Sequence, residues 1–118
     1  MKGFKNALIY INGKGIVRTS LTVENGKIET IGKEPDEYYD IPEDAVVVPG
    51  FIDEHIHGSA NCDAMDGTTE ALETIARSIA CEGTVGFLAT TMTQSPENIS
   101  KAMSAVKDYK SDKKDYGA

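Results

Sequence analysis

The sequence has few cationic side chains and no long apolar segment. It carries 12 Lys and Arg residues against 19 Asp and Glu residues, which gives a formal net charge of −7. A nucleic-acid-binding surface needs cations to displace the counterions of the phosphate backbone, and an anionic membrane attracts the same cations, so we expect neither as a partner. The longest apolar run near the start, Ala7 to Ile11, is too short for a membrane span or a signal-peptide core.

Cysteine is also scarce. The chain has two cysteines, Cys62 and Cys81, which are too few for a disulfide framework. This usage predicts a reducing, cytoplasmic setting. The length of 118 residues excludes several large domains, and 40% hydrophobic with 26% charged residues is ordinary globular usage.

The first third of the chain is predicted to form short strands. Its apolar-rich segments are Phe4–Ile11, Ile16–Val23 and Lys27–Ile31. Asn25 and Gly26 separate the last two segments and predict a tight hairpin, because a type I′ turn needs positive φ at both central residues. Ile28 and Ile31 break strict alternation, so we expect a bulge or an early strand end there. The polar stretch of residues 33–44 is predicted to be a connecting loop.

From residue 45 onward, the pattern predicts strands that alternate with helices. The candidate strands are residues 45–48, 51–57 and 85–89. Thr68 is the predicted N-cap of a first helix, and Gly83 is its predicted C-terminal cap. Ser95 and Pro96 are predicted to begin a second helix. Strand–helix–strand–helix is the unit of parallel α/β architecture.

Each predicted helix has one apolar face. In the first, the spacing i, i+3, i+4, i+7, i+8 places together Leu72, Ile75, Ala76, Ile79 and Ala80. In the second, the corresponding face comprises Ile99, Ala102, Met103 and Val106. We expect these faces to pack into the core.

Both histidines lie in one short segment, residues 53–58, which read Asp-Glu-His-Ile-His-Gly. Because side chains alternate along a strand, Asp53, His55 and His57 are expected to share one face. Neutral imidazole nitrogens are ligands of zinc and iron, so His55 and His57 are candidate metal ligands and Asp53 is a candidate residue for orienting one of them. The alternative is a pair of exposed or hydrogen-bonded imidazoles with no metal.

Other polar residues near this segment have simpler interpretations. Cys62 is expected to be a small incidental thiol. Asp63 and Asp66 are expected to cap or solvate a loop. Thr90 follows the second predicted strand, where a polar residue at a strand end is ordinary.

The segment around the histidines resembles a known superfamily. Residues 48–58, Val-Pro-Gly-Phe-Ile-Asp-Glu-His-Ile-His-Gly, are similar to the first barrel strand of amidohydrolases. Residues 63–66, Asp-Ala-Met-Asp, and residues 82–93, Glu-Gly-Thr-Val-Gly-Phe-Leu-Ala-Thr-Thr-Met-Thr, resemble the N-acetylglucosamine-6-phosphate deacetylase family more narrowly. The likeness spans nearly the whole chain and is more specific after residue 45.

The resemblance implies an α/β fold in which N-terminal β-sandwich strands precede the first two β/α units of a (β/α)8 metal-dependent hydrolase barrel. Residues 1–48 would form part of the small sandwich domain, and residues 49–118 would begin the barrel. A full barrel needs about 250 residues, so the barrel would be incomplete. By resemblance, His55 and His57 correspond to the paired histidine ligands of a divalent metal, zinc or iron, and favour a second-metal or two-metal variant.

The resemblance also implies a function. The family hydrolyses N-acetylglucosamine 6-phosphate to glucosamine 6-phosphate and acetate. The glutamate ligand, the catalytic aspartate and the phosphate-binding groups would lie beyond Ala118, so no catalytic residue and no further cofactor-binding residue is assigned here. We therefore expect an N-terminal part of such an enzyme that is inactive alone.

Two alternatives remain open from the sequence. One is another amidohydrolase, similar to dihydroorotase or hydantoinase, which shares the Pro-Gly-x-x-Asp-x-His-x-His opening. The other is a small non-catalytic module that binds metal or associates with itself. Open sheet edges and an uncovered apolar face would favour a homo-oligomer in either case.

Overall fold

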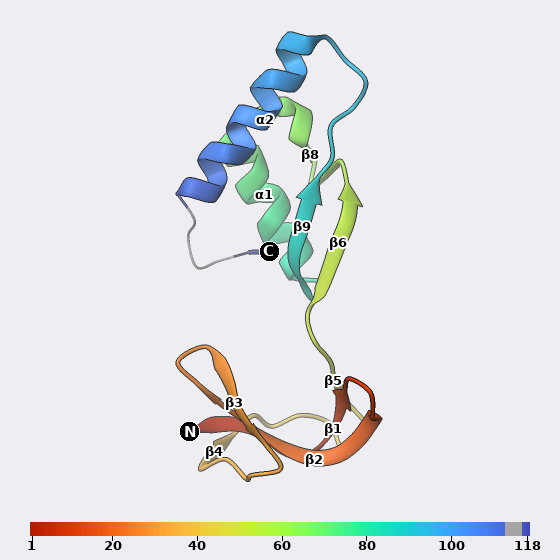
Figure 1. Ribbon diagram of the computed structural model, residues 1–118, viewed down its shortest axis with the longest axis vertical. Coiled ribbons are helices and arrows are strands. Elements are labelled where there is room, and N and C mark those ends of the chain that lie inside the picture. The colour runs from red at the N-terminus through yellow and green to blue at the C-terminus, as the bar shows by residue number, and fades with distance from the viewer. Residues whose placement is uncertain (113–116) are drawn as a thin grey trace. The chain divides into compact units, whose positions relative to one another are not determined.

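The computed structural model describes residues 1–112 and 117–118. The chain divides into two compact units, Met1–Pro49 and Gly50–Ala118, and each is considered by itself. The first unit is made of strands, and the second combines a parallel strand pair with two helices (Figure 1). A mixed α/β fold, as predicted, is confirmed at this level. Within the described residues, neither helix has the length and hydrophobicity that crossing a membrane requires.

The first unit is a single sheet with the strand order β3-β2-β1-β4, in which β5 also pairs with β1. Its strands are β1 (Lys2–Ile11), β2 (Gly15–Glu24), β3 (Lys27–Ile31), β4 (Glu37–Tyr38) and β5 (Val46–Val47). The first three are antiparallel, whereas β4 and β5 run parallel to β1. The sheet buries Ala7, Ile9 and Leu21.

The predicted hairpin between β2 and β3 is confirmed. Asn25 and Gly26 have φ of 51° and 73°, the positive values that a type I′ turn requires. The predicted irregularity is also present, because Thr22 pairs with Thr30 whereas Val23 pairs with Ile28. One extra residue therefore lies in β3, which is a bulge.

The prediction of a plain loop over residues 33–44 was wrong in part, since β4 lies within it. Lys2 pairs with Glu37 there. The Tyr39 ring lies 5.2 Å from the ring of Phe4, and the Lys2 ammonium lies 4.4 Å from the Tyr39 centroid. Aromatic and cation–π contacts stabilise a short parallel pairing that has no periodicity to reveal it.

The second unit pairs β6 (Phe51–Ile56) in parallel with β9 (Thr84–Ala89). Between them lie a small hairpin of β7 (Gly58–Ser59) and β8 (Cys62–Asp63), a 3₁₀ turn η1 (Ala64–Asp66), and the helix α1 (Thr69–Ala80). The helix α2 (Pro96–Ser111) follows β9. The strand predicted over residues 51–57 ends at Ile56 in the structure, one residue earlier than expected.

The start of each helix agrees with the sequence prediction. The Thr68 hydroxyl accepts the backbone N–H of Ala71, and the Ser95 hydroxyl accepts that of Asn98. Gly83 is not the C-terminal cap of α1, because the cap residue after Ala80 is Cys81, which has right-handed geometry. Gly83 instead lies in the following turn, with φ of 89°.

The apolar face of α1 is confirmed for four of its five predicted residues, since Ala80 is half-buried, and that of α2 needs one correction. Side chains buried in α1 are Ala71, Leu72, Ile75, Ala76 and Ile79. In α2, Ala102 and Ala105 are buried, whereas Met103 is 64% exposed. Consecutive residues of a helix differ by about 100° in direction, so a face centred on Ala102 turns Met103 outward.

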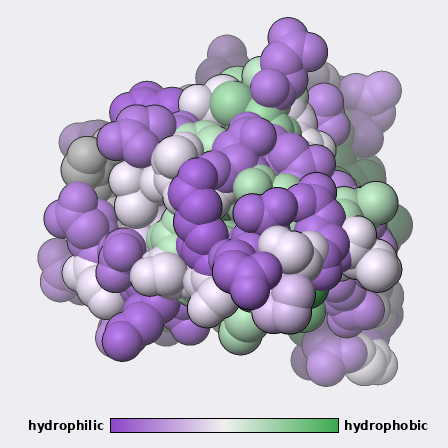
Figure 2. Space-filling view, turned by 90° about the horizontal axis from the view of Figure 1, so that it is seen from above, coloured by the Kyte–Doolittle hydropathy of each residue, from purple (hydrophilic) through white to green (hydrophobic). Residues whose placement is uncertain are grey.

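Large apolar side chains remain exposed on the parallel strand pair. They are Phe51, Ile52, Val85 and Leu88. Hydrophobic residues also reach the surface among hydrophilic ones in the end-on view of Figure 2. Within the described residues, β6 and β9 pair only with each other, so each strand has one unpaired edge.

The core of the second unit provides a test of this packing. We expect Ile75→Ala to lower the free energy of unfolding by about 2–5 kcal/mol, because Ile75 is 1% exposed and truncation leaves a cavity. Met103→Ala is the matched control and should change it by less than about 0.5 kcal/mol. Urea denaturation followed by circular dichroism measures both, and equal effects would contradict the packing described.

Candidate metal-binding site

The two histidines lie together at the C-terminal end of β6. The Nε2 atoms of His55 and His57 are 3.3 Å apart, and the rings meet edge to face with centroids 5.0 Å apart. His55 is exposed and His57 is half-buried. The shared direction that alternation predicted for the two rings is therefore observed.

The ring of His57 is held by the neighbouring strand. Its Nδ1 lies 3.1 Å from the backbone carbonyl oxygen of Thr90, which follows β9. A carbonyl oxygen only accepts hydrogen bonds, so the neutral ring donates its Nδ1–H and leaves the lone pair of Nε2 free. The backbone N–H of Thr90 donates to the carbonyl of Ile56 at 2.9 Å, which fixes the two segments side by side.

Asp53 acts differently from the sequence interpretation. Its carboxylate accepts the backbone N–H of His55 at 3.0 Å, and no hydrogen bond from Asp53 to either imidazole is found in the described structure. The pairing with β9 is irregular between Asp53 and Ile56. Asp53 thus orients the main chain of His55, because a short side chain reaches the amide two residues on more easily than the ring.

A small hairpin follows His57 directly. Its tip residues, Ala60 and Asn61, have φ of 52° and 61°. A Cβ atom on Gly58 would clash with the carbonyl oxygen of Cys62, so only glycine fits there. The hydroxyls of Ser59 and Ser78 are 2.9 Å apart and join the hairpin to α1.

The capping role expected for Asp63 and Asp66 is confirmed. The Asp63 carboxylate accepts the backbone N–H of Met65 at 2.7 Å, and the Asp66 carboxylate accepts the backbone N–H of Asp63 at 2.9 Å. This reciprocal pair is a capping box. Cys62 is half-buried in β8, and within residues 1–112 and 117–118 no group of three potential ligands includes it.

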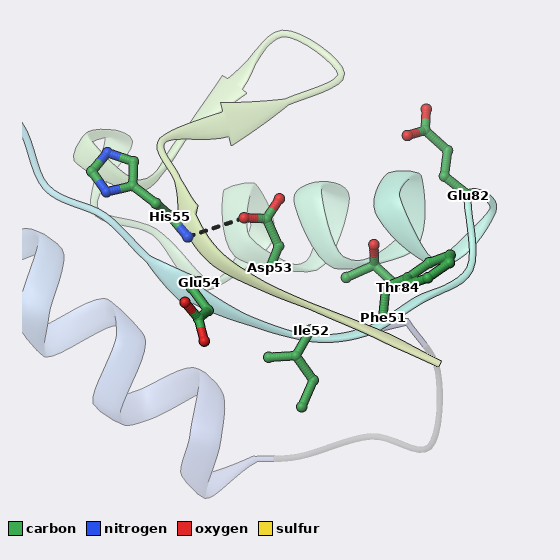
Figure 3. Close-up of a pocket in the computed structure, with 7 residues that line it drawn as sticks. All are labelled: Phe51, Ile52, Asp53, Glu54, His55, Glu82 and Thr84. Atoms are coloured by element: carbon green, nitrogen blue, oxygen red, sulfur yellow. Dashed lines mark hydrogen bonds between the residues drawn. The ribbon is translucent and has the colours of Figure 1, made fainter. Parts of the chain in front are cut away.

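An open hollow runs beside β6. It is lined by Phe51, Ile52, Asp53, Glu54, His55, Glu82 and Thr84. Asp53 and His55 project to one side of the strand, whereas Ile52 and Glu54 project to the other (Figure 3). The lining includes three carboxylates and no Lys or Arg, so it favours cations.

Sequence reasoning missed two features of this region. The Thr90 carbonyl has no sequence signal, because every residue carries one; the Thr90 hydroxyl, which was considered, donates instead to the carbonyl of Leu88. Glu82 enters the hollow from the turn after α1, which only the three-dimensional pairing of β6 with β9 reveals.

Comparison with known proteins gives a consistent result. N-acetylglucosamine-6-phosphate deacetylase of Bacillus subtilis (strain 168) is 37% identical over 111 residues, which cover 90% of this chain and 28% of that protein. The chain resembles N-acetylglucosamine-6-phosphate deacetylases. The resemblance noted in the sequence is thereby confirmed, and the dihydroorotase-like or hydantoinase-like alternative is not favoured.

Solved structures of these deacetylases agree with the fold. The enzyme of Pasteurella multocida superposes with a TM-score of 0.75 at 26% identity, over 98% of this chain and 32% of that one. The enzyme of Thermotoga maritima gives 0.74 at 27% identity, over 91% of this chain and 27% of that one. No family model matches the chain. The chain therefore spans about a third or less of the length of the deacetylases it matches.

The hydrogen bond to Thr90 predicts the tautomers of both rings. In the metal-free protein with neutral rings, His57 should carry its hydrogen on Nδ1, so the Nε2 contact requires His55 to carry its hydrogen on Nε2. Long-range ¹H–¹⁵N correlation spectra distinguish the two forms. His55→Ala should leave the His57 tautomer unchanged, and an Nε2–H form of His57 in that variant would contradict the role of Thr90.

Proposed function

We propose that this chain forms the N-terminal part of a metal-dependent deacetylase that hydrolyses N-acetylglucosamine 6-phosphate to glucosamine 6-phosphate and acetate. The observation that carries the proposal is the convergence of His55 and His57 at the end of a parallel strand. It occurs in a chain 37% identical over 111 residues to such a deacetylase. Active sites of β/α barrels lie at the carboxyl ends of strands, where this pair lies.

The spacing of the two nitrogens fits a metal ion. Two nitrogens bound to a tetrahedral zinc at 2.0–2.1 Å lie about 3.3–3.4 Å apart. The Nε2 atoms of His55 and His57 are 3.3 Å apart. This agreement supports both residues as ligands of one divalent cation, zinc or iron.

The residues of this chain would prepare the site in three ways. Thr90 fixes the His57 ring so that its Nε2 lone pair faces His55, and Asp53 fixes the backbone of His55. When bound, a divalent cation polarises a carbonyl oxygen and lowers the pKa of water, which amide hydrolysis needs. The carboxylates around the hollow add a negative field that attracts the cation.

The remaining assignments follow from the likeness to the deacetylases. Residues 1–48 would contribute to a small β-sandwich domain, and residues 49–118 would supply the first two β/α units of an incomplete (β/α)8 barrel. The unpaired edges of β6 and β9 are consistent with a barrel that further strands complete. The same proposal includes the catalytic residues of such a deacetylase, the binding of an amino-sugar phosphate, a homo-oligomeric state and a cytoplasmic location.

A chimaera tests the proposal. In it, this chain replaces the matched 111-residue stretch of the Bacillus subtilis deacetylase. We expect acetate release from N-acetylglucosamine 6-phosphate. His57→Ala removes a proposed metal ligand and should lower kcat/KM more than about 100-fold. Removal of only the hydrogen-bond partner of a metal ligand typically lowers activity about 10–100-fold. Cys81→Ser, at an exposed position, is the control; equal losses in both variants would contradict the metal role.

The isolated chain should show no turnover. It supplies two candidate ligands, and catalytic zinc sites use three protein ligands with an open position. An acetate-release assay on the purified 118-residue chain with added zinc measures this. Turnover that depends on His55 would refute the proposed inactivity of the chain alone.

A further inference from the structure

The main chain of His57 is held by the 3₁₀ turn η1. The backbone N–H of Ala64, the first residue of η1, donates to the carbonyl oxygen of His57 at 2.8 Å. Ala64 is 2% exposed, so water competes little for this contact. Thr90 holds the ring of His57, whereas Ala64 holds its main chain. The position of η1 therefore affects the direction in which the Nε2 lone pair of His57 points.

A lysine of α2 holds the other end of η1. The Lys101 ammonium donates to the carbonyl oxygen of Asp66, the last residue of η1, at 3.2 Å. The last carbonyl groups of a helical turn have no partner within the turn, so they need one from outside it. The stem of Lys101 also lies over Gly67, because a Cβ atom on Gly67 would be 2.9 Å from its Cγ atom and 3.1 Å from its Cδ atom. One side chain thus supplies both a donor and an apolar cover.

The path from Asp66 to His57 is short and hydrogen-bonded throughout. The Asp66 carboxylate accepts the backbone N–H of Asp63 at 2.9 Å. Asp63 pairs with Gly58 in the hairpin of β7 and β8, and Gly58 directly follows His57 in the chain. A displacement of Asp66 would therefore reach His57 by two routes, one through Ala64 and one through Gly58.

We propose that Lys101 is a positioning residue of the candidate metal site, which holds η1 against α2 and thereby fixes the direction of His57. The inference rests on the proposed metal-binding role of His57 and extends it to a residue of a distant helix. Its basis is a hydrogen bond, so a side chain with a similar stem and no donor should lose the effect. Arginine keeps donors at the end of the stem and should retain most of it.

The first test uses the deacetylase chimaera with Lys101→Met, which keeps an unbranched apolar stem over Gly67 and removes the ammonium. Lys101 is exposed and acts through η1. We therefore expect kcat and the affinity for zinc to fall about 3–10-fold, less than for a direct partner of a metal ligand, with KM unchanged. Lys101→Arg should restore most of both. Lys107→Met, at another exposed position of α2, is the matched control and should change neither.

The second test follows hydrogen exchange in the 118-residue chain itself, without metal or substrate. Lys101→Met should raise the exchange rate of the Ala64 amide about 2–10-fold, the factor that corresponds to one hydrogen bond. The amides of the buried residues of α1 should exchange as before, because their packing is unchanged. The ¹⁵N shifts of the His57 ring should move in Lys101→Met and not in Lys107→Met.

The two tests separate this inference from the proposed function. Unchanged kcat and zinc affinity in Lys101→Met would overturn the positioning role and leave the proposed function intact. Faster exchange throughout the second unit would also overturn it, because Lys101 would then merely stabilise the fold. An inactive chimaera whose Ala64 amide and His57 ring still respond in the chain alone would contradict the proposed function and support the contact path.

Discussion

The parallel alignment of β6 with β9 is the constraint on which the candidate site depends. Backbone hydrogen bonding from Thr90 to Ile56 sets the ends of the two segments side by side, and the Thr90 carbonyl then receives the Nδ1–H of His57. The ring is thereby turned so that its other nitrogen faces His55. The two imidazoles converge because a neighbouring strand holds one of them, and sequence proximity alone would not hold them in this arrangement.

That constraint explains both the extent and the limits of sequence-based prediction. The hairpin at Asn25-Gly26, the caps Thr68 and Ser95 and the apolar face of α1 were predictable, because each arises from local backbone geometry or periodicity. The short strand β4 was missed, since a two-residue pairing carries no period. The direction of Met103 was misjudged because a helix face is defined by what packs on it.

The candidate site divides in the same way. The candidate ligands were identifiable from residue type and spacing, and strand alternation predicted that their rings lie on the same side of β6. The partners that hold them were not identifiable: the Thr90 group involved is main chain, and the Asp53 carboxylate bonds an amide instead of a ring. The residue types, and therefore their possible chemistry, can be read from the sequence, whereas the orientation of a ligand depends on contacts between distant segments.

The hydrogen bond between His57 and Thr90 joins residues 33 positions apart. The intervening hairpin and α1 can form from local contacts. The parallel pairing of β6 with β9 requires closure of this long loop, which costs conformational entropy. We therefore expect the histidine pair to converge only once β6 and β9 have paired. In a newly made or partly denatured chain, the two imidazoles would rotate independently. Selective binding of a cation would therefore require the native pairing of β6 with β9.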